Sequence, residues 1–204
     1  MGLVQSVVVP KTYLVRVGFA IWAALLLVIV GTLMVGHWYT LPKPDKDDAV
    51  LAGALADLRG PKAVDRWMAV HVLYTECRCS ERIFEHLFAR ELVPGLSEKI
   101  LLVGANSSIE AQARKSGYEV TVLSPAALRE QFALESAPLL LVTNPKGSIV
   151  YSGGYTTRKQ GPDIRDVSII TSLMRQQSTD ELPLYGCGTS TELQSALDPL
   201  GIKY

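Results

Sequence analysis

Residues 17–36 form an uncharged run, VGFAIWAALLLVIVGTLMVG, near the start of the chain. At about 1.5 Å per residue, a helix of this length spans about 30 Å, the thickness of the hydrocarbon core of a bilayer. Lys11 and Arg16 precede the run without an acidic residue, and Trp38 follows it. The run predicts one transmembrane anchor over residues 17–39. The positive charges place residues 1–16 in the cytoplasm and the rest of the chain across the membrane.

A cleaved signal peptide is the alternative interpretation of this run. Signal peptides have apolar segments of about 7–15 residues that end in a small-x-small cleavage site. The run here is longer, and the Ala-rich residues 52–56 lie too far downstream, beyond a charged linker. An uncleaved anchor is therefore expected.

The remainder of the chain divides into a linker, a domain and an extension. Residues 40–60 combine a Pro- and charge-rich linker with a short helix, and residues 61–178 have the length of one domain. Residues 179–204 form a C-terminal extension. The chain has 20 Lys+Arg against 20 Asp+Glu, without a basic stripe that interleaves aromatic residues. This charge pattern argues against nucleic acid as a partner.

Segments of strand and helix character alternate through the domain. Apolar runs rich in β-branched residues predict strands, and apolar residues at helical spacing predict helices. The order β-α-β-α-β-α-β-β-α is typical of a mixed sheet with helices on both sides, so the predicted fold class is α/β. The expected strands are 67–74, 99–103, 118–123, 138–143 and 148–152, and the expected helices are 49–58, 80–92, 107–116, 125–132 and 163–177.

Two cysteines, Cys77 and Cys79, lie in the short turn between the first strand and the helix that follows it. The unpaired N–H groups and the dipole at a helix N-terminus favour a thiolate over a thiol. Arg78 between the cysteines acts in the same direction, whereas Glu76 opposes it. The placement favours a reactive cysteine pair over a structural disulfide or two inert buried thiols.

The order of elements, the cysteine motif after the first strand and Ala137-Pro138 before a hairpin together resemble the thioredoxin fold. An extra helix and strand before the proline, and the hairpin sequence PLLLVTNPKGSIV over residues 138–150, look like the TlpA/ResA-type and peroxiredoxin-related branch. The resemblance implies a thiol-disulfide oxidoreductase anchored in a bacterial inner membrane, with its domain periplasmic or otherwise extracytoplasmic. It also implies a cis peptide bond before Pro138, beside the cysteines, and substrate binding by Ala137 and Pro138. Pro138 as an ordinary proline that starts an edge strand is the alternative.

The cysteine motif departs from the Cys-x-x-Cys pattern of that family. If Cys77 matches the first family cysteine, Ser80 occupies the second position; if Cys79 matches the second, Glu76 occupies the first. Residues i and i+2 do not share a helix face, so a Cys77–Cys79 disulfide requires a non-helical turn. Such a small ring would be strained and exchange-prone, which suits a disulfide donor or isomerase.

A third cysteine, Cys187, lies between two glycines in the C-terminal extension. The glycines allow its backbone to turn tightly and to approach another group closely. It is interpreted as a resolving thiol for Cys77 or Cys79, as a third thiolate ligand for copper or another soft metal, or as a packed small residue. His71 and His86 are expected to be structural rather than metal ligands.

The sequence thus predicts a membrane-anchored protein that exchanges thiols and disulfides with protein cysteines. Cys77 and Cys79 are the expected catalytic pair, Ala137 and Pro138 the expected substrate-binding residues, and Cys187 an additional thiol. No cofactor is expected. Two alternatives remain: a copper chaperone that uses Cys77, Cys79 and Cys187, and a thioredoxin-like scaffold without catalytic turnover.

Overall fold

The computed structural model describes residues 10–38 and 40–198, which fall into two compact units that separate after residue 39. The first unit contains α1 (Lys11–Trp38), which begins directly after Pro10 and therefore earlier than the predicted anchor. Its segment Lys11–Thr32 is long and apolar enough to cross a membrane. The apolar side chains from Leu14 to Val30 have no core to pack against and are mostly exposed, as with Leu27 at 71%.

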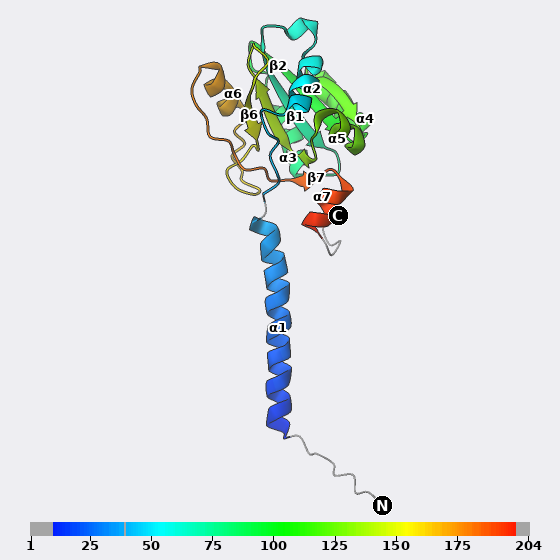
Figure 1. The fold of residues 1–204 in the computed structure, drawn as a ribbon, viewed down its shortest axis with the longest axis vertical. Coiled ribbons are helices and arrows are strands. Elements are labelled where there is room, and N and C mark those ends of the chain that lie inside the picture. Colours follow the sequence, from blue (N-terminus) through cyan, green and yellow to red (C-terminus); the bar gives the residue numbers. More distant parts are fainter. Residues whose placement is uncertain (1–9, 39, 199–204) are drawn as a thin grey trace, which may run out of the picture. The chain divides into compact units, whose positions relative to one another are not determined.

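The second unit is built on a five-stranded mixed sheet in the order β3-β2-β1-β5-β6 (Figure 1). Strands β1, β2 and β3 are parallel to one another, whereas β5 is antiparallel to β1 and β6 is antiparallel to β5. The sequences of the three central strands, β2, β1 and β5, are mostly apolar because helices cover both faces of the sheet. The strands are β1 (Trp67–Tyr74), β2 (Leu96–Val103), β3 (Glu119–Leu123), β5 (Leu139–Thr143) and β6 (Ile149–Gly153).

Successive side chains of β1 point to opposite faces of the sheet and divide the core into two layers. Ala69 and Leu73 pack with helices α3, α4 and α6 on one face, and Met68 and Val70 pack with α2 and α5 on the other. Figure 1 shows the sheet between these helices. The helices are α2 (Ala49–Arg59), α3 (Arg78–Ala89), α4 (Ser107–Lys115), α5 (Pro125–Phe132) and α6 (Asp166–Met174), with a 3-10 turn η1 (Pro61–Ala63) before β1.

Side-chain caps fix where several helices begin. Asp48 accepts hydrogen bonds from the Val50 and Leu51 N–H groups at the start of α2. Asn106 caps α4, and Ser124 caps α5 with a proline in the first turn. Each cap satisfies N–H groups that have no partner within the helix, which sets the chain direction into the next element.

This arrangement confirms the predicted α/β fold class and its thioredoxin-like form. Two parallel strands are followed by an antiparallel hairpin, with α4 and β3 inserted before a cis Ala137-Pro138 peptide bond. The boundaries differ from the predictions by a few residues, because α3 begins at Arg78, β2 begins at Leu96 and α6 begins at Asp166.

The C-terminal extension packs into the same compact unit as the predicted domain. Leu182 and Leu184 are buried in the two core layers. The Leu41 N–H donates to the Leu184 carbonyl at 2.8 Å, so the linker and the extension form an antiparallel bridge. Beyond this bridge, β7 (Cys187–Gly188) pairs with β4 (Ser136–Ala137), and α7 (Thr191–Leu197) follows.

Candidate active site

The turn after β1 places Cys77 at the N-cap of α3, with Arg78 and Cys79 as the first two residues of the helix. The Cys77 backbone is extended, with φ −107° and ψ 115°. Its carbonyl accepts hydrogen bonds from the N–H groups of Ser80 and Glu81. The helix was expected to begin only at Ser80. It begins two residues earlier because Cys77 takes the capping position itself.

Ser80 stabilises this turn from inside the domain. The buried Ser80 hydroxyl oxygen accepts a hydrogen bond of 3.0 Å from the Tyr74 N–H at the end of β1. In a Cys-x-x-Cys motif that begins at Cys77, Ser80 would be the second cysteine. In this protein its hydroxyl instead has a structural contact.

The extension brings Cys187 to the same place from the far end of the chain. In the β4–β7 pair, Cys187 stands opposite Ala137 and Gly188 stands opposite Ser136. Gly186 makes the close approach possible, since a Cβ there would lie 2.0 Å from the Ala137 carbonyl oxygen and 2.6 Å from Pro138 Cδ. The glycines beside Cys187 were expected to allow such an approach, and Gly186 does so.

The sulfur atoms of Cys77 and Cys187 are 2.7 Å apart. Cys77 Sγ also lies 3.8 Å from the Ala137 carbonyl oxygen. None of the three cysteines is in a disulfide bond in this structure. A pair of sulfurs at this separation can be joined by a disulfide bond with only a small movement of either side chain, since the bond itself is about 2.05 Å long.

The surroundings of Cys77 favour its ionised form. Hydrogen bonds with the side chains of Cys187 and Cys79 lower the pKa of Cys77 to about 3, against the opposing effect of burial. The backbone N–H groups of Ser80 and Cys79 act in the same direction as the two thiols, although neither makes a full capping hydrogen bond. A thiolate is the nucleophile of disulfide exchange, so this environment suits Cys77 to attack a disulfide that forms next to it.

Access to the three cysteines is unequal. Cys77 is only 2% exposed, whereas Cys79 and Cys187 are half-buried. Cys79 lines a cavity of about 470 Å³ together with Pro138 and Tyr185. Ala137 is fully buried, and its backbone edge is paired with Cys187.

All five residues singled out from the sequence thus lie together: Cys77, Cys79, Ala137, Pro138 and Cys187. Sequence reasoning missed Arg82, Tyr155 and Tyr185, which line the cavity beside Cys79. Arg82 lies four residues after Arg78, at helical spacing, and that spacing could have indicated a shared face. Nothing local in the sequence marks the two tyrosines.

His71 and His86 belong to a largely buried charged network. His71 is fully buried, with Nδ1 2.9 Å from the Tyr155 hydroxyl and Nε2 3.3 Å from the Glu98 carboxylate. His86 contacts Asp166, and Arg90 bridges Asp166 and Glu98. Burial acts to raise the pKa of Glu98, but hydrogen bonds from His71 and Arg90 outweigh it and lower that pKa to about 2. The network gives both histidines structural partners.

In residues 10–38 and 40–198, no group of three His, Cys, Asp or Glu side chains is arranged to hold a metal ion. Cys77 instead makes hydrogen bonds with the side chains of Cys187 and Cys79.

No family model matches the chain, and no curated protein matches it in sequence. Solved structures of similar shape include a hypothetical protein from Sinorhizobium meliloti, with 17% identity, a TM-score of 0.46, and coverage of 75% of this chain and 91% of that one. An uncharacterized conserved protein from Geobacillus kaustophilus has 12% identity and a TM-score of 0.40, covering 64% and 80%. The thioredoxin domain of a thiol-disulfide oxidoreductase from Bacteroides vulgatus has 10% identity and a TM-score of 0.39, covering 61% and 84%.

Proposed function

We propose that this protein is a membrane-anchored thiol-disulfide oxidoreductase that acts on protein cysteines, with Cys77 and Cys187 as its redox couple. The observation that carries the proposal is the contact of 2.7 Å between the two sulfurs, one of which has its pKa lowered to about 3. The sequence hypothesis paired Cys77 with Cys79. Pairing with Cys187 is favoured by the β4–β7 register, which holds the two sulfurs together from separate parts of the chain.

The proposed reaction transfers two electrons between the couple and a substrate. A sulfur of the cysteine cluster attacks the substrate disulfide, which releases one substrate sulfur and forms a mixed disulfide with the other. Exchange within the cluster then places the disulfide on Cys77. The Cys187 sulfur then attacks Cys77 Sγ, so that a Cys77–Cys187 disulfide forms and the displaced sulfur leaves as a thiol with the proton that Cys187 loses. In sum, the substrate disulfide is reduced to one thiol and one thiolate, and the couple is oxidised. The reverse sequence oxidises a substrate dithiol, and neither direction requires a cofactor.

The location of this chemistry follows from α1. We propose that α1 anchors the protein in a bacterial inner membrane and that the second unit lies on the periplasmic or extracytoplasmic side. Lys11 and Arg16 flank the apolar segment on its N-terminal side, which supports this orientation. Fusion of alkaline phosphatase to the C-terminus tests it, because that reporter is active only when exported.

The activity is tested by incubating the oxidised full chain with a reduced, unfolded protein substrate and counting the substrate disulfides that form. Cys77→Ser and Cys187→Ser should each abolish transfer, whereas Arg175→Gln, on the exposed end of α6, serves as the matched control. Wild-type activity in Cys77→Ser would contradict the proposal. Binding of one Cu(I) that needs all three thiols, without transfer, would favour the copper chaperone instead, and neither property would indicate a scaffold.

A further inference from the structure

The accessible face of the cysteine cluster is the cavity beside Cys79. Cys77 and Cys187 are not among the residues that line this cavity, and Cys77 is 2% exposed. The backbone edge of Ala137 is occupied by β7, so an incoming chain cannot add a strand there. A substrate sulfur that approaches through the cavity therefore meets Cys79 first, and side chains rather than strand pairing must recognise it.

The cavity combines an apolar floor with a positively charged rim. Ile83, Ile164 and Pro138 contribute apolar surface, and Arg78 and Arg82 contribute two positive charges from one face of α3. Its volume of about 470 Å³ lies in the range of sites that bind small groups. The size suits a cysteine with its neighbouring side chains.

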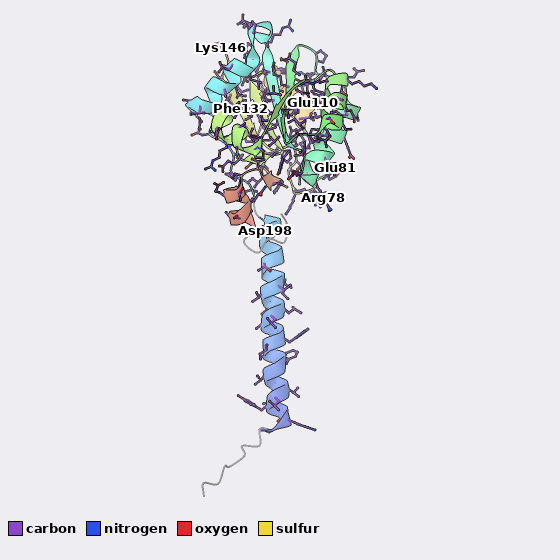
Figure 2. The ribbon with its side chains drawn as sticks, turned by 90° about the vertical axis from the view of Figure 1, so that its right-hand side faces the viewer. Arg78, Glu81, Glu110, Phe132, Lys146 and Asp198 are labelled. Atoms are coloured by element: carbon purple, nitrogen blue, oxygen red, sulfur yellow. The ribbon has the colours of Figure 1, made fainter. Side chains whose placement is uncertain are left out.

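The charges at the rim favour an anion. Arg82 is half-buried, and its Nη2 donates a hydrogen bond of 3.1 Å to the Gly161 carbonyl oxygen, which restrains the guanidinium at the rim. Arg78 is exposed, and Glu81, which projects from the same turn, offsets one of the two positive charges (Figure 2). The positive end of the α3 dipole adds to the remaining charge.

We propose that this cavity is the substrate site, that Cys79 forms the first mixed disulfide, and that the preferred substrate cysteine has a carboxylate beside it, as in an acidic stretch of a protein. This proposal rests on the proposed exchange function and specifies the charge of the substrate that the site prefers. Cys79 Sγ attacks one substrate sulfur, the other leaves as a thiol with the Cys79 proton, and a Cys79–substrate disulfide forms. Cys77 then attacks Cys79 Sγ and releases the second substrate thiolate. Finally Cys187 attacks Cys77 Sγ, which returns Cys79 to a thiol and leaves the Cys77–Cys187 disulfide.

The contact between Cys79 and Cys77 supports this order of transfer. Cys77 makes hydrogen bonds with the side chain of Cys79 and with that of Cys187, which lies on a different element. The extended backbone of Cys77 keeps the turn before Cys79 non-helical, as a transient Cys77–Cys79 bond requires. Cys77 thus stands between the accessible thiol and the thiol of the extension, as the transfer requires.

The charge preference is tested with three disulfides of different charge on the reduced full chain in a neutral detergent: dithiodipropionate (dianion), hydroxyethyl disulfide (neutral) and cystamine (dication). The readout is the rate for the dianion divided by that for the neutral probe, which cancels any change in the reactivity of Cys79 itself. Arg82→Gln should lower this ratio about tenfold at low salt, the effect of one unit charge at close range. Arg78→Gln should lower it less, because its side chain is exposed, and 0.5 M salt should weaken both effects.

Two control variants test whether the charge of the cavity lining sets this rate ratio. Glu81→Gln removes the negative charge of the same rim and should raise the ratio, whereas Arg175→Gln should leave it unchanged. A ratio that Arg82→Gln and Glu81→Gln leave unchanged would overturn the charge preference.

The first attachment point is read by mass mapping. In Cys77→Ser, which blocks onward transfer, the probe should be found on Cys79; attachment to Cys187 instead would overturn the assigned order. The Cys77–Cys187 couple would still form with the neutral probe in the wild-type chain if only the site assignment failed. Its absence with every probe would instead refute the proposed function.

Discussion

The reduction potential of the Cys77–Cys187 couple should depend on pH in a way that two ordinary thiols cannot reproduce. With its pKa lowered to about 3, Cys77 is already a thiolate at neutral pH and has no proton to release on oxidation. Oxidation then releases one proton instead of two. For a two-electron couple each proton contributes about 30 mV per pH unit, so the potential should fall by about 30 mV per unit between pH 5 and pH 8, not by about 59 mV.

The same thiolate should make the couple oxidising. Stabilisation of the Cys77 thiolate favours the reduced form, and at pH 7 a pKa four units below neutrality raises the potential by at most about 120 mV above that of a pair with ordinary thiols. The assay is equilibration of the full chain in glutathione buffers at several pH values, with alkylation and mass analysis at each point.

Variants of Cys79 test whether the low pKa of Cys77 is the cause of the raised reduction potential. Cys79→Ala removes one of the two thiol donors to Cys77 and should lower the potential by about 30 mV for each unit by which the pKa of Cys77 rises. Cys79→Ser keeps a donor and should stay closer to the wild-type value. A slope near 59 mV per pH unit in the wild-type chain would refute the reasoning, because it would mean that Cys77 is protonated in the reduced state.

Three further predictions concern stability and the membrane. Gly186→Ala should lower the free energy of unfolding by about 1–3 kcal/mol, because its Cβ would overlap the Ala137 carbonyl oxygen; in urea unfolding, Gly53→Ala, whose Cβ meets no atom within 4 Å, should be neutral or stabilising. Glu98→Gln should cost about 3 kcal/mol, because it leaves the buried His71 without its carboxylate partner and Arg90 with Asp166 alone. Since the pKa of Glu98 is lower in the folded state, its contribution is complete above pH 4.5 and is lost as pH falls toward about 2; this part of the acid sensitivity should disappear in the variant. Removal of residues 1–39 should release the protein from carbonate-washed membranes, and retention there would contradict the proposed anchor.

Much of the fold could be predicted because its elements have strong local patterns. The apolar runs of β1 and β5 are buried on both sides, and the helices have apolar faces and capping residues. Strand β2 was predicted too short at its start because Glu98 reads as a solvent-exposed residue. Its carboxylate is buried against His71 of β1 and Arg90 at the end of α3. These partners belong to other elements, so the local sequence pattern around Glu98 does not reveal its burial.

The residues of the candidate site could be predicted from the sequence, but the contact between Cys77 and Cys187 could not. The turn that carries Cys77 and Cys79 follows from a strand that runs into a helix, and Ala137-Pro138 from the hairpin that follows it. The partner of Cys77 depends on β7, a strand of two residues whose register is set by packing rather than by a periodic pattern. The extension is held in place by buried Leu182 and Leu184, which alternate with less buried residues over too short a stretch to predict a pairing.

The most direct test of the account is the identity of the disulfide that forms on mild oxidation. The full chain, with metal removed, would be equilibrated across a glutathione redox series, trapped by alkylation and digested so that each cysteine is mapped by mass. The account predicts one reversible two-electron couple that joins Cys77 to Cys187 while Cys79 remains alkylated. A stable Cys77–Cys79 disulfide, or three thiols that stay reduced across the whole series, would contradict it.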